Sequence, residues 1–180
     1  MLVYSLLCVA LATGNALFWL HKWHEQGVEL CFADTMMTGV QPSFLLMLLI
    51  PPTLGLVHQL KFILEQPFVI CALDNRARLA RNLLAALLFI AFRAVMAVSI
   101  PSIALGALLF RGGKPCTWES GASYYAYMTG QTLITPVKTG SLIVWQAMTI
   151  WLTVLLVSIL FLSINLSCES HQLGSILSWG

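Results

Sequence analysis

Charged side chains are scarce in this chain of 180 residues. Only 9% of the residues are Asp, Glu, Lys or Arg, whereas 59% are hydrophobic. Ordinary soluble domains carry about 25% charged residues, and so few charges could not cover the surface of a soluble fold. The composition therefore predicts an all-α integral membrane protein, with room for a single bundle of four or five spans.

Acidic side chains are missing from the long apolar runs altogether. Membrane proteases and transferases need paired Asp residues, a Ser/Lys or Cys/His pair, or a metal at a shared depth. No GxSxG, HExxH or Walker A motif occurs either. We therefore expect a protein that is not an enzyme and has no catalytic residues. The net charge of +2 is too small to indicate a nucleic-acid partner.

Cysteine and histidine patterns are equally sparse. The five cysteines include no CxxC pair, and no Cys/His cluster has the spacing of a metal site, so we expect no metal and no other cofactor. His58 is the one histidine in a predicted span, whereas a b-type haem would need two. Cys31 and Cys116 fall in different loops on the same predicted side, which leaves a disulfide between them open.

Apolar runs predict four transmembrane helices in one domain, residues 1–180. Trp19 and Trp23 beside Lys22 are typical of a membrane–water interface and end the first run. The polar residues 25–42 predict a loop that can include a short surface helix. Pro51-Pro52 and Pro101 lie within runs, where proline removes a helical hydrogen bond. The predicted spans cover residues 2–20, 43–64, 82–104 and 141–164.

A short segment lies between the second and third spans. Pro67 is a typical first residue of a helix, and the apolar residues that follow it are too few to cross a bilayer. We therefore expect a surface helix over residues 67–73. Arg76, Arg78 and Arg81 follow within a few residues and begin a long apolar helix.

Loop charges indicate the orientation. Lys and Arg divide four against four between the two sides, but the arginines after residue 75 are the densest group, and dense positive charge favours the cytoplasmic side. We expect a multi-pass protein of the cell membrane, with the N-terminus and residues 65–81 cytoplasmic. The basic residues would also bind anionic membrane lipids.

Arg93 is the one charged residue within the third span. It lies twelve residues beyond Arg81, about 18 Å along a regular helix. An arginine at the centre of a bilayer costs about 2.5–3.5 kcal/mol on insertion scales and usually faces a protein interior or an aqueous path. Two interpretations stay open: Arg93 contacts a substrate or another subunit, or the span begins later and Arg93 snorkels toward the headgroups.

The stretch PFVICALDNRAR, Pro67 to Arg78, followed by an apolar helix, resembles the region between the second and third spans of exporter-class ABC transporter permeases. In that family an aromatic-hydrophobic stretch and a basic patch precede a long apolar helix, and the short helix docks in a cleft of the ATPase. The sequence departs from the family at Cys71-Ala72, where an arginine is usual. It also has four clear spans where six are usual, which fits a truncated chain or a split subunit. The resemblance implies coupling contacts by Phe68, Ile70, Asn75, Arg76 and Arg78.

Taken together, the resemblance implies the transmembrane subunit of a bacterial ABC exporter. Its partners would be a cytoplasmic ATPase subunit and a second membrane subunit, identical or related. The weakly polar spans fit export of a peptide, a lipid or a hydrophobic compound. The alternative is a small non-catalytic accessory subunit of a larger membrane complex.

Overall fold

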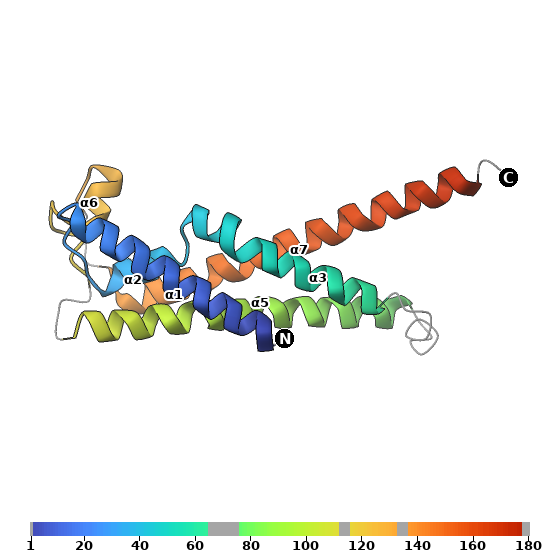
Figure 1. Cartoon of the computed structure of the whole chain (residues 1–180), viewed down its shortest axis with the longest axis horizontal. Coiled ribbons are helices and arrows are strands. Elements are labelled where there is room, and N and C mark those ends of the chain that lie inside the picture. The colour runs from blue at the N-terminus through green and yellow to red at the C-terminus, as the bar shows by residue number, and fades with distance from the viewer. Residues whose placement is uncertain (1, 65–75, 112–115, 133–136, 178–180) are drawn as a thin grey trace.

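The computed structural model describes residues 2–64, 76–111, 116–132 and 137–177, and this part of the chain is helical with no strand (Figure 1). The predicted surface helix over residues 67–73 lies outside the described residues. The elements are α1 (Leu2–Glu25), α2 (Phe32–Thr38), the π-helix η1 (Phe44–Leu49), α3 (Ile50–Leu64), α5 (Arg76–Leu109), α6 (Tyr124–Thr129) and α7 (Thr139–Leu177).

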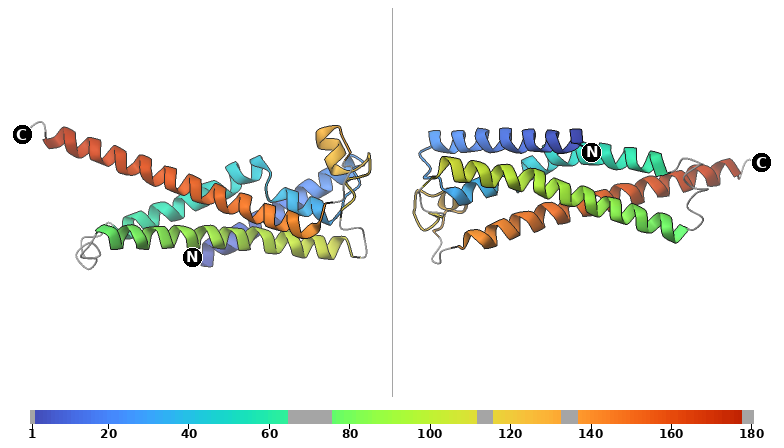
Figure 2. Two further views of the ribbon diagram at one scale, coloured as in Figure 1. Left: turned by 180° about the vertical axis from the view of Figure 1, so that it is seen from behind. Right: turned by 90° about the horizontal axis from the view of Figure 1, so that it is seen from below.

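Four helices are long and apolar enough to cross a membrane, and they confirm the predicted all-α membrane fold. They cover Leu2–Glu25, Phe44–Ile63, Ala80–Leu109 and Thr139–Asn165. α1 and α5 run in the same direction, and the η1–α3 helix and α7 run the opposite way (Figures 1 and 2). The largest core cluster joins residues from all four helices, among them Cys8, Phe44, Ile90 and Ile150.

The second span widens before its two prolines. η1 continues directly into α3, and Pro51 and Pro52 stand at the start of α3. Their missing amides remove the hydrogen bonds that the carbonyls of Met47 and Leu48 would otherwise accept in an α-helix. The turns just before the prolines take the wider π pattern, as single π-turns inside α-helices do. The sequence predicted the loss of helical hydrogen bonds here, and the resulting distortion is this π-helix.

α7 is longer than the sequence predicted. We expected the last span to end near residue 164, but the helix continues without interruption to Leu177. No proline occurs between residues 165 and 177. Its 39 residues correspond to about 58 Å, so α7 reaches well beyond a hydrocarbon core of about 30 Å.

A short helix, α2, does occur within residues 25–42, as the sequence allowed, but its position corrects the expectation that such a helix lies at the surface. The helix lies inside the bundle, and Ala33, Asp34 and Thr35 are fully buried. α2 packs along the last part of the third span. The start of α2 lies beside Gly106, and Gly39, just after its end, lies beside Val98. A Cβ on Gly106 would lie 2.6 Å from Phe32 Cδ2 and 2.7 Å from Thr35 Oγ1. The glycine thus allows the close approach of α2 and α5, which no local sequence pattern reveals.

Candidate functional site

The basic start of α5 lies at the end of the bundle away from α2 and α6 (Figure 1). Arg78 and Arg81 are exposed there, as expected for residues that meet lipid headgroups or a partner. Arg78 precedes Arg93 by 15 residues, about 22 Å along the helix. Of the other predicted coupling residues, Phe68, Ile70 and Asn75 lie outside the described residues. Arg76 begins α5, but its side chain is not among those described, so the coupling contacts stay predictions.

Arg93 lies at one end of a groove between α1 and α5. Its Nη1 donates to Ser5 Oγ at 3.3 Å, across 88 residues of sequence. Its guanidinium also lies over the ring of Phe89, 5.0 Å from the ring centroid. A guanidinium held over an aromatic face gains about 0.5–2 kcal/mol from the ring quadrupole. Arg93 is therefore positioned by one contact from α1 and one from its own helix.

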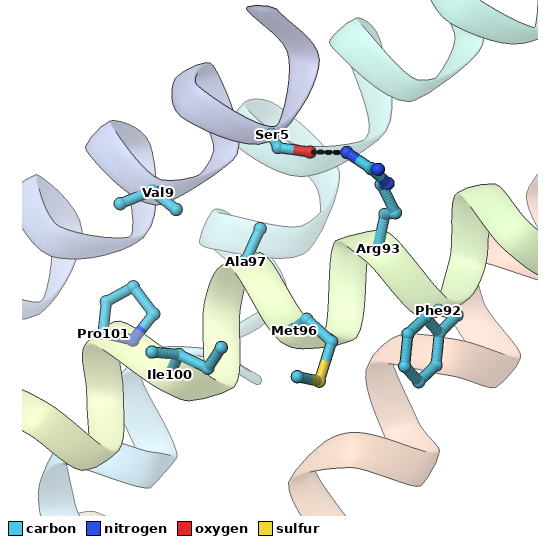
Figure 3. A pocket seen from close by; sticks show the side chains of 8 residues that line it. All are labelled: Ser5, Val9, Phe92, Arg93, Met96, Ala97, Ile100 and Pro101. Atoms are coloured by element: carbon cyan, nitrogen blue, oxygen red, sulfur yellow. Dashed lines mark hydrogen bonds between the residues drawn. The ribbon is translucent and has the colours of Figure 1, made fainter. Parts of the chain in front are cut away.

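The groove has one polar end and is otherwise apolar. It has a volume of about 530 Å³, within the usual range for ligand pockets of about 300–1,000 Å³. Ser5 and Arg93 mark the polar end, and Val9, Ile100 and Pro101 lie toward the other end (Figure 3). Phe92, Met96 and Ala97 complete the lining. Sequence analysis singled out Arg93 but missed Ser5, because a lone serine in an apolar helix carries no signal of its partner.

Asp34 is a second polar centre that the sequence analysis did not identify. Its Oδ2 accepts from the backbone N–H of Cys31 at 2.7 Å, and its Oδ1 accepts from Trp118 Nε1 at 2.7 Å. Burial raises the pKa of this carboxyl, although both hydrogen bonds act in the opposite direction. A usable signal did exist, because a carboxylate three residues after the N-cap, here Cys31, is typical of helix starts.

We call residues 26–38 and 116–129 the loop cap, because the two segments bind each other at one end of the bundle. The backbone N–H of Glu29 donates to the carbonyl of Ala122 at 2.8 Å, and Ser120 Oγ bonds Glu29 Oε2 at 2.9 Å. The ring of Tyr124 lies 4.2 Å from that of Trp23, centroid to centroid. These contacts join the two segments of the loop cap to each other and to the end of α1.

Cys31 and Cys116 are unpaired thiols within the loop cap. Cys31 is buried with Trp118 and Leu142, and Cys116 packs against the same cluster. Burial, and then the neighbouring Asp34 carboxyl, raise the pKa of the Cys31 thiol to about 11, which keeps it protonated at neutral pH. The sequence left open a disulfide between Cys31 and Cys116. In the structure the two residues belong to one cluster, and they form no disulfide with each other.

No group of three or more His, Cys, Asp or Glu side chains with the arrangement of a metal site occurs among the residues described. The loop cap and the Arg93 groove are two polar features of the described bundle. In comparisons with known proteins, no family model, no curated protein and no solved structure matches the chain.

Proposed function

We propose that this chain is the transmembrane subunit of a bacterial ABC exporter, which couples ATP hydrolysis in a cytoplasmic partner to export of a peptide, lipid or hydrophobic compound. The observation that carries the proposal is the stretch Pro67 to Arg78 placed directly before α5. The chain has no Walker A motif, so the proposed activity requires a separate ATPase.

The length of α5 supports a docking role for its start. The helix has 34 residues, about 51 Å, against a hydrocarbon core of about 30 Å. Its first turns therefore have enough length to stand outside the bilayer. Arg78 and Arg81 are exposed in these turns and are available to an acidic cleft of the ATPase. Charge complementarity of this kind speeds the encounter of two proteins and fixes how they dock.

The outward faces of two spans support a second membrane subunit. Large apolar side chains at intervals of four residues are exposed along α7, and a similar stripe follows α5. Side chains four apart share one helix face. Along α7 the stripe is Val144, Met148, Leu152, Leu156 and Leu160, and along α5 it includes Leu84, Leu88, Phe92 and Ile100. Such faces meet either lipid or the helices of another subunit.

The test reverses charge at the start of α5. In the Arg76→Glu/Arg78→Glu double variant we expect co-purification with the candidate ATPase, and ATP hydrolysis by the complex, to fall by at least about tenfold. The reason is that reversing two docking charges costs more than about 1.4 kcal/mol. The matched control is Arg111→Glu/Lys138→Glu, which reverses two exposed charges beyond the ends of α5 and α7 nearest the loop cap.

Unchanged association and turnover in the first double variant would refute the coupling proposal. In that case, loss of a co-purifying partner when the α7 stripe is changed by Leu152→Ser/Leu156→Ser would favour the accessory-subunit alternative. That alternative predicts a binding surface spread over helix faces rather than centred on residues 67–81.

A further inference from the structure

The groove between α1 and α5 is amphiphilic along its length. Its charged end holds the Arg93 guanidinium, and its lining beyond that end has no other charged group. From Arg93 to Pro101 is eight residues, about 12 Å along the helix. A ligand that matches this groove has a compact anion at one end and a hydrocarbon chain at the other.

The charge of Arg93 has no acidic partner among the described residues and is available to an anion from outside the chain. No Asp or Glu occurs in residues 1–24 or 75–118, which include most of α1 and all of α5. The side-chain contacts of the guanidinium are a hydroxyl and an aromatic ring, and both are neutral. A guanidinium fork binds the oxygens of a phosphate, and likewise those of a carboxylate, in bidentate fashion.

The level of Arg93 along the bundle indicates where that anion comes from. Its partner Ser5 lies three residues from the start of α1. Trp23 stands 18 residues farther along α1, about 27 Å away, close to the thickness of a hydrocarbon core. Trp19, Lys22 and Trp23 are residues typical of one interface, so the start of α1, and Arg93 beside it, lie in the half of the bilayer toward the opposite interface. Helical side chains point toward the helix N-terminus, and this direction carries the guanidinium farther toward the same headgroups.

We propose that the groove binds one anionic glycerophospholipid from the leaflet at which α1 begins. Its phosphate binds Arg93, which Ser5 and Phe89 hold in place. One acyl chain follows Val9, Met96 and Ile100 toward the middle of the bilayer. A lipid of this leaflet has its headgroup at the level of Arg93 and its acyl chain toward Ile100, which matches the polar and apolar ends of the groove. A bound lipid needs no ATPase, but it covers Phe92 and Ile100 of the α5 stripe, so the second membrane subunit proposed above then packs on the α7 stripe.

Native mass spectrometry of the purified full chain in a neutral detergent tests the site. The probes are dioleoyl phosphatidylglycerol, dioleoyl phosphatidylcholine and oleate. We expect phosphatidylglycerol to bind about fivefold more tightly than phosphatidylcholine, since one basic residue near the surface contributes about 1 kcal/mol. Arg93→Gln removes this preference, and Arg93→Lys keeps most of it because the charge remains.

A second pair of variants tests the chain end of the groove without changing Arg93. Val9→Trp fills the groove and should lower phosphatidylglycerol binding at least fivefold, about 1 kcal/mol. Val3→Trp makes the same change at an exposed position outside the groove and should leave binding unchanged. Each variant must elute as wild type does, and Arg93→Lys supplies the comparison if Arg93→Gln does not fold.

Three results would overturn the proposal. The first is equal binding of the two phospholipids by wild type, or a preference that survives Arg93→Gln. The second is oleate that displaces phosphatidylglycerol mole for mole, which would make any anionic amphiphile the ligand. The third is a disulfide between two Ile100→Cys copies in membranes, which would show that a second chain covers the groove.

Discussion

The indole N–H of Trp118 donates to Oδ1 of Asp34 at 2.7 Å and joins the segment after α5 to helix α2, 84 residues away in the sequence. Both residues are buried, Asp34 completely. The bond holds α2 by its first turn to the segment after α5. Because Asp34 also accepts from the backbone of Cys31, one carboxylate fixes the start of α2 and the fold of the second loop together.

Trp118→Phe should lower the free energy of unfolding by about 1–3 kcal/mol, because it removes a donor from a buried carboxylate and keeps most of the apolar volume. Trp145→Phe is the control, since Trp145 is half exposed on α7. Thermal unfolding of both variants in detergent measures the difference. Equal midpoints for the two variants would mean that the bond does not stabilise the loop cap.

Asp34→Asn should remove a dependence of stability on pH. Burial raises the pKa of Asp34 in the folded protein above its ordinary value of 3.8, so the folded state holds the proton more tightly than the unfolded state. The contribution of this group is therefore complete below that ordinary value and is lost as pH rises through the folded pKa. As pH rises above about 4, the unfolding free energy of wild type should therefore fall relative to that of Asp34→Asn. Parallel stability curves for the two proteins would contradict the assignment.

Gly106→Ala should displace α2. The added methyl would meet Phe32 and Thr35 well inside contact distance, and overpacking of this kind costs about 1–3 kcal/mol. The matched control is Gly14→Ala in α1, where a Cβ meets nothing within 4 Å and the helix gains up to about 1 kcal/mol. Thermal unfolding should therefore shift in opposite directions for two substitutions of the same kind.

Cys31 should react slowly with thiol reagents. Its thiol is buried and its pKa is raised to about 11, so little of the reactive thiolate is present at neutral pH. Peptide mass spectrometry after treatment with N-ethylmaleimide should find Cys116, which is partly exposed, modified well before Cys31. Trp118→Ala opens the cluster and should speed modification of Cys31, and rapid labelling of Cys31 in folded wild type would contradict its burial.

Single cysteine variants test the predicted orientation. Arg78 and Glu119 are exposed and lie toward opposite ends of the bundle. In intact cells, a membrane-impermeant maleimide should label the Glu119→Cys variant and leave the Arg78→Cys variant unlabelled until the membrane is permeabilised. The reverse pattern would place residues 65–81 outside the cytoplasm and would remove the basis for docking a cytoplasmic ATPase.

The spans were predictable because they depend on local composition. A run of about 20 apolar residues is enough to cross a bilayer, wherever the rest of the chain lies. The predicted runs and the helical spans agree to within a few residues at most ends. The end of the third span is later than predicted, at Leu109 rather than residue 104, since Pro101 does not interrupt α5. The coupling residues around residue 70 and the role of Arg93 stay predictions.

The polar centres were not predictable, because each is made by residues far apart in sequence. Asp34 lies within residues 25–42, which the sequence predicts as a loop, and only its contact with Trp118 shows that it is inside the bundle. Ser5 carried no signal until α1 brought it to Arg93. By itself, the sequence determined that the described chain has four segments long and apolar enough to cross a membrane, because this property depends on apolar length alone. Only the tertiary structure decided that α2 is buried and which polar groups meet, because a bilayer does not distinguish one helix pairing from another and side-chain packing does.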